Sequence, residues 1–108
     1  MGSDDLQRRY YPRVNKLCFI SYVNREGDVQ KTPVSLGRTL NISISGVGME
    51  VYQELAVDSF MEMEIAVNEG TIISVTGTVV HITPADNGTF YAGIKFDVPR
   101  SDLGTPSE

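Results

Sequence analysis

Two clusters of residues in this chain are of types that bind anions and nucleotide bases. The first contains three arginines, Arg8, Arg9 and Arg13, within the segment Arg-Arg-Tyr-Tyr-Pro-Arg. An arginine guanidinium can donate two parallel hydrogen bonds to a phosphate or to the edge of a guanine, and its plane can stack on a base. The spacing of Arg9 and Arg13 is a weak signal by itself, because arginines are common.

The second cluster is the segment Asn-Ile-Ser-Ile-Ser-Gly, in which polar and apolar residues alternate. Successive side chains of a β-strand point to opposite faces. We therefore expect Asn41 and Ser43 to lie side by side on the outside of the protein. The residues expected on the opposite, core-facing side are Leu40, Ile42 and Ile44. Gly46 follows, and its missing side chain would let a ligand or the N-terminal segment approach the backbone closely.

Alternation of this kind covers most of the chain after Val14 and predicts β-strands. The expected strands are residues 17–23, a run over 40–51 interrupted at Gly46 and Gly48, and residues 60–67, 71–83 and 90–96. Clusters rich in Gly, Asn and Asp separate them and predict turns. About six strands in one domain would leave open edges, so we expect an all-β fold that closes into a six-stranded antiparallel barrel.

The composition limits the kinds of function. A chain of 108 residues with 41% hydrophobic residues is expected to form one domain with a buried core. One cysteine, Cys18, and one histidine, His81, do not make an ordinary zinc site. We find no nucleophile–base pair, so we expect neither an enzyme nor a metal protein. Without a long apolar run or a leader, we expect no membrane insertion and a cytoplasmic location.

The net charge of −5 is distributed unevenly. Residues 1–16 contain four Arg or Lys against two Asp, whereas residues 17–108 contain five against twelve Asp or Glu. An acidic body does not suit a long nucleic acid, but a short basic arm suits a small anion. We therefore expect a flexible basic arm over residues 1–13, a barrel over 14–100, and a tail over 101–108 with at most a short helical turn.

Together the two clusters resemble the two-part signature of the PilZ domain family. The similar parts are Arg9-x-x-x-Arg13, Asn41-x-Ser43-x-x-Gly46 and the later Ala-Gly-Ile-Lys-Phe, and the resemblance runs from about residue 8 to residue 98. It implies a six-stranded β-barrel that binds the bacterial second messenger cyclic di-GMP. The ligand-binding residues that it implies are Arg8, Arg9, Arg13, Asn41, Ser43 and Gly46.

The resemblance carries two finer implications. An arginine directly before the first motif, here Arg8, is similar to the version of the family that accepts two intercalated cyclic di-GMP molecules. Asn41 departs from the aspartate that many PilZ domains have at this position. An amide oxygen accepts hydrogen bonds from guanine less strongly than a carboxylate does. We therefore expect binding to survive, with an affinity that the sequence does not determine.

As a single barrel, the chain is expected to act through an unidentified protein partner. The outputs that the resemblance implies are motility, polysaccharide export, pilus biogenesis and biofilm formation. Two other functions remain open. One is a PilZ-like protein-interaction module that no longer binds nucleotide, and the other is a small barrel that binds single-stranded nucleic acid. The acidic body disfavours the latter. For His81 we expect a structural role.

Overall fold

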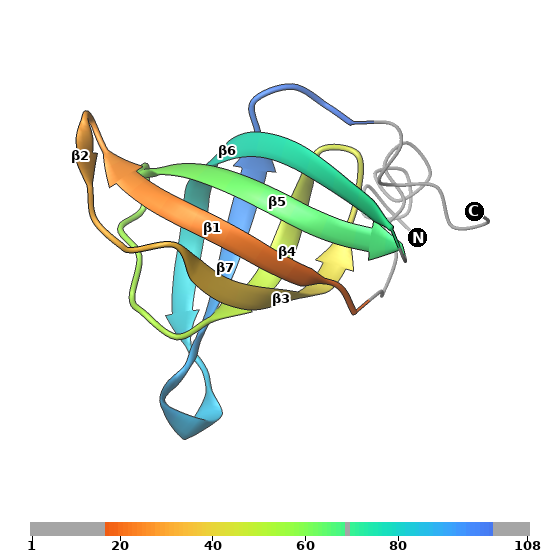
Figure 1. The fold of residues 1–108 in the computed structure, drawn as a ribbon. Coiled ribbons are helices and arrows are strands. Elements are labelled where there is room, and N and C mark those ends of the chain that lie inside the picture. The colour runs from red at the N-terminus through yellow and green to blue at the C-terminus, as the bar shows by residue number, and fades with distance from the viewer. Residues whose placement is uncertain (1–16, 69, 101–108) are drawn as a thin grey trace, which may run out of the picture.

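The computed structural model describes residues 17–68 and 70–100, which form seven β-strands and one short 3-10 turn (Figure 1). The strands are β1 (Phe19–Glu26), β2 (Val29–Gln30), β3 (Ser35–Ile42), β4 (Gly46–Val51), β5 (Phe60–Asn68), β6 (Thr71–Pro84) and β7 (Phe90–Phe96), and the turn is η1 (Asp86–Gly88). The expected arm and tail lie outside these described residues. Within them, no helix has the length and apolar character of a membrane span.

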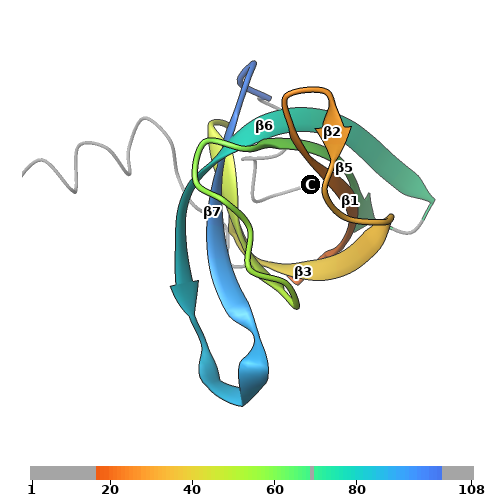
Figure 2. The same cartoon turned by 90° about the vertical axis from the view of Figure 1, so that its left-hand side faces the viewer.

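Six of the strands close into an antiparallel barrel, as the sequence predicted. Their order around the barrel is β1, β3, β4, β7, β6 and β5, and β5 then pairs with β1, with Ile20 opposite Ile65. Figure 2 shows the resulting ring. The short β2 pairs only with the end of β1 and lies outside the ring. Closure therefore leaves none of the six long strands with an open edge.

The core follows from the alternation of apolar and polar residues. On β5, Met61, Met63 and Ile65 are at most 2% exposed, whereas Glu62 and Glu64 between them face solvent. The methionines at these positions therefore fill the core. Cys18 is also buried, as expected for a small apolar side chain.

The turn chemistry predicted the β6–β7 hairpin correctly. Asn87 and Gly88 both have positive φ, at 68° and 79°. Glycine and asparagine adopt this left-handed conformation more readily than other residues do. The hairpin extends beyond the ring of the barrel, as Figures 1 and 2 both show. β6 is consequently long enough to pair with β5 through its first half and with β7 through its second.

The predicted facing of Leu40 is wrong. The pairing of β3 with β4 shifts register between Thr39 and Asn41, so Leu40 is the extra residue of a β-bulge. Thr39 and Ile42 are buried, whereas Leu40 is 38% exposed on the outer face. The predicted strand differs from the observed one in this bulge, in the missed residues 35–39 at the start of β3, and in the turn over residues 43–45.

Candidate functional site

A groove of about 390 Å³ lies on the outer face of the barrel over β3, β4, β7 and β6. We call it the outer groove. Its lining residues are Leu40, Asn41, Ser43, Ser45, Gly46, Val47, Gly48, Met49, Val80, His81, Tyr91, Ala92, Gly93, Ile94 and Lys95. The three residues of the second motif, Asn41, Ser43 and Gly46, are among them. The fold therefore places the three described residues of the predicted site in the outer groove.

Asn41 lies on the outer face, as predicted. It is the last residue but one of β3 and is partly buried, opposite Gly48 on β4. A Cβ placed on Gly48 would be 3.1 Å from the Oδ1 of Asn41 and 3.2 Å from its Nδ2. The Asn41 amide therefore lies across the strand over Gly48, at the wall of the outer groove.

Ser43 does not lie beside Asn41 on the surface, contrary to the prediction. It is 4% exposed and comes after the end of β3, where the chain turns toward β4. Its Oγ accepts a hydrogen bond from the Ser45 backbone N–H at 3.3 Å, and its own backbone N–H donates to the Gly46 carbonyl at 2.9 Å. The alternation fails here because Ser43 belongs to the turn, where its bonds hold the backbone in place.

Position 46 must be a glycine because β4 and β7 lie close together there. A Cβ at this position would be 2.3 Å from the carbonyl oxygen of Ile94 on β7. The turn that precedes it is attached to the end of β7 and to the chain that follows β7. The Ser45 carbonyl accepts a hydrogen bond from the Phe96 N–H at 2.9 Å, and the Ile44 carbonyl accepts one from the Arg100 N–H at 2.7 Å. The second motif thus forms a rigid corner of the outer groove.

Arg8, Arg9 and Arg13 lie outside the described residues, and the barrel side of the groove is the part that the structure describes. The lining side chains of His81, Tyr91 and Lys95 were not among the predicted site residues. The alternation of Tyr-Ala-Gly-Ile-Lys did indicate that Tyr91 and Lys95 share a face. The sequence did not indicate that His81 lies in the groove. The direction of its side chain is set by the bulge at Val80, which depends on the pairing of β6 with β7.

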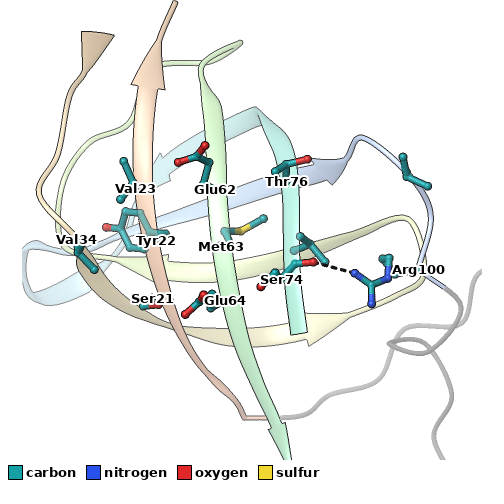
Figure 3. Close-up of a pocket in the computed structure, with 12 residues that line it drawn as sticks. Ser21, Tyr22, Val23, Val34, Glu62, Met63, Glu64, Ser74, Thr76 and Arg100 are labelled. Carbon is teal, nitrogen blue, oxygen red and sulfur yellow. Dashed lines mark hydrogen bonds between the residues drawn. The ribbon is translucent and has the colours of Figure 1, made fainter. Parts of the chain in front are cut away.

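A second and larger hollow, of about 550 Å³, lies over β1, β5 and β6 (Figure 3). Glu62 and Glu64 line it, and none of the three predicted site residues that the structure describes does. Arg25 is already paired with Glu62 at 3.2 Å, and Arg100 donates to the Ser74 carbonyl at 2.9 Å. A lining with two carboxylates is unfavourable for an anion, so the outer groove is the better site for a phosphate-bearing ligand despite its smaller volume.

The described residues contain no group of three or more His, Cys, Asp or Glu that could hold a metal ion. Burial raises the pKa of Tyr22 to about 12, an effect that the Ser35 hydroxyl partly offsets. Hydrogen bonds from Thr89 and Arg38 lower the pKa of Glu50. Neither Tyr22 nor Glu50 lines the outer groove. Both shifts are explained by contacts that hold the fold together.

Comparison with known proteins gives a family and a fold. The family model described as PilZ domain matches residues 7–104 of the chain. The solved structure of the PilZ domain with c-di-GMP of YcgR from Escherichia coli is similar, with a TM-score of 0.61 and 17% sequence identity. The similarity covers 84% of this chain and 79% of that chain, and at this identity it establishes the fold alone. A search of curated proteins found no match.

Proposed function

The chain belongs to the PilZ domain family, and from this premise we propose that it is a receptor for cyclic di-GMP. The observation that carries the proposal is the position of Asn41, Ser43 and Gly46 around one outer groove, in a chain that also contains Arg9-x-x-x-Arg13. The YcgR domain of similar fold is described with c-di-GMP, which supports the class of ligand.

The chemistry of the residues gives each a role in this proposal. Arg9 and Arg13 hydrogen-bond to the O6 and N7 edge of guanine and neutralise phosphate, which a planar guanidinium does better than a lysine. Asn41 contacts the nucleotide from the barrel side through its amide. Ser43 and Gly46 keep the corner of the groove in shape, and through it the position of Asn41.

We propose that the protein binds cyclic di-GMP without transforming it and passes the signal to a protein partner. Ordering the basic arm over the ligand would cost roughly 1–2 kcal/mol per residue, which ligand contacts must offset. An arm ordered by nucleotide presents a surface that a partner can recognise. Motility, polysaccharide export, pilus biogenesis and biofilm formation are the outputs proposed for that partner.

Calorimetric titration with cyclic di-GMP tests this function. We expect saturable binding by the wild type and binding weakened roughly 5- to 150-fold in Arg13→Ala, because removal of one bidentate guanine contact costs about 1–3 kcal/mol. Lys31→Ala is the matched control, since Lys31 is exposed, lies away from the groove and pairs only with Glu26 at 3.5 Å among the described residues. Absence of both heat and thermal stabilisation in the wild type would leave the interaction-module function instead.

The same titration tests the role of Arg8. If a third guanidinium supports a second intercalated nucleotide, the wild type binds two molecules per chain and Arg8→Ala binds one. A wild-type stoichiometry near one would contradict this role while leaving the receptor function intact.

A further inference from the structure

The floor of the outer groove is a row of four residues across four strands. Asn41 on β3 is opposite Gly48 on β4, Gly48 is opposite Gly93 on β7, and Gly93 is opposite His81 on β6. Figure 1 shows these four strands side by side. The two central positions carry no side chain, and the polar side chains from the two ends of the row lie over them, Asn41 over Gly48 and His81 over Gly93.

The imidazole of His81 covers Gly93. A Cβ at Gly93 would be 2.3 Å from Cε1, 2.5 Å from Nδ1 and 3.1 Å from Nε2 of His81. Three ring atoms therefore occupy the space above the Gly93 backbone. His81 is nevertheless an exposed residue that lines the groove. The ring thus lies against the sheet at Gly93, while the residue as a whole stays exposed at the groove.

Two β-bulges form the walls. Leu40 on β3 and Val80 on β6 are the extra residues where the register shifts, and they are 38% and 48% exposed. Each wall thus offers an apolar side chain next to a polar one, Leu40 beside Asn41 and Val80 beside His81. This combination suits a heterocyclic base, which has an apolar face and a hydrogen-bonding edge.

A cation lies beside the floor, farther along β7. Lys95 follows Gly93 by two residues on the same face of β7, which is about 7 Å along the strand. Among the described residues that line the groove, Lys95 is the one with a positively charged side chain. It forms no ion pair with another described residue. A base over Gly93 would therefore have a positive charge at a distance that the sugar of one nucleotide can bridge.

We propose that His81 is the stacking platform for one guanine base of the ligand and that Lys95 binds the adjoining phosphate. This inference rests on the proposed function and adds two ligand contacts on the barrel side. The ring gives affinity without selecting the base, because every base has a face that can stack. Selection of guanine is left to Asn41 and the arginines, which can read its edge.

A purely structural role for His81 makes a different prediction. An aromatic ring over a cross-strand glycine protects the backbone and stabilises the sheet without any ligand. In that case, removal of the ring lowers the melting temperature of the free protein and leaves nucleotide affinity unchanged. A stacking role changes affinity whatever happens to the melting temperature.

Calorimetry on substituted proteins separates the two roles of His81 and tests Lys95. We expect His81→Ala to weaken cyclic di-GMP binding roughly 5- to 150-fold, the range for loss of one base–aromatic stack. His81→Phe keeps a ring and should stay within about threefold of wild type. Thr83→Ala, an exposed residue of β6 outside the groove, is the matched control. Lys95→Ala should weaken binding and reduce its salt dependence, whereas Lys31→Ala should do neither.

One measurement needs no variant. His81 is the single histidine of the chain, so its imidazole NMR signals are assigned without ambiguity. Stacking of guanine should shift the ring protons upfield on titration. Unchanged ring signals with saturable binding, or a His81→Ala affinity equal to wild type, would overturn the inference while leaving the receptor function standing. A wild type that binds no cyclic di-GMP would overturn both.

Discussion

Gly46 and Gly48 show that two glycines of one strand can be present for different reasons. The space for a Cβ at Gly46 is filled by a backbone oxygen of β7, which cannot move without displacing the strand. The corresponding space at Gly48 is bordered by the Asn41 amide, the far end of a side chain that can rotate. Gly46 thus serves the packing of the barrel, and Gly48 serves the shape of the groove.

Alanine at these two positions should therefore have unequal effects on stability. We expect Gly46→Ala to lower the free energy of unfolding by about 1–3 kcal/mol through overpacking. Gly48→Ala should stay within about 0.5 kcal/mol of wild type, as substitutions that neighbours can accommodate usually do. Urea denaturation of the two variants measures both changes. Equal losses would mean that the contact of Gly46 with Ile94 does not limit packing.

Glu50 connects β4 to β3 and to the segment just before β7, in the sheet that supports the groove. Its carboxylate accepts a hydrogen bond from Arg38 Nε on β3 at 2.7 Å and one from the Thr89 hydroxyl, just before β7, at 2.8 Å. Both bonds favour the charged form and lower the pKa of Glu50 below its ordinary value of 4.5. The attachment of β4 to its neighbours therefore depends on pH.

The sign of this dependence follows from the lowered pKa. The contribution of Glu50 to stability is present above pH 4.5, its ordinary pKa, and is lost as the pH falls through the lower pKa of the folded state. Glu50→Gln should be less stable than wild type at neutral pH, and the difference should shrink in acid. Urea denaturation between neutral and acidic pH measures it, with Glu64→Gln on the solvent face of β5 as the control. A difference that is constant across this range would contradict the assignment.

The net negative charge of residues 17–108 favours a small anionic ligand over a long nucleic acid. Residues 17–108 carry seven more acidic than basic side chains, and two of the carboxylates line the larger hollow. A nucleic acid strand must be neutralised at many phosphates, whereas cyclic di-GMP has two. The three arginines near residue 10 and Lys95 in the groove match the smaller demand.

We therefore expect no saturable binding of an oligo-dT strand in salt of about 0.15 M, where long-range attraction is screened. Fluorescence anisotropy with a labelled oligonucleotide measures this, and cyclic di-GMP binding by the same preparation shows that the protein is active. Saturable binding with a steep salt dependence would instead support the single-stranded nucleic-acid function.

Local patterns in the sequence were enough to predict the β-class, most strand positions and the β6–β7 hairpin. Alternation, as in Met61-Glu62-Met63, and turn residues such as Asn87 and Gly88 act through their immediate neighbours. The closed barrel followed from the number of strands and the cost of open edges. The arginine and asparagine motifs, which carry the family resemblance, can likewise be read from the sequence alone.

Only the tertiary structure decided how the groove is built. The bulges at Leu40 and Val80 depend on the register between paired strands, and the alternation of one strand carries no information about its partner's register. Ser43 is buried because a turn replaces the strand there, and His81 meets Gly93 because the hairpin pairs β6 with β7. These contacts join residues that are far apart in the sequence or lie where a strand ends. At such positions the pairing of the backbone overrides the local pattern.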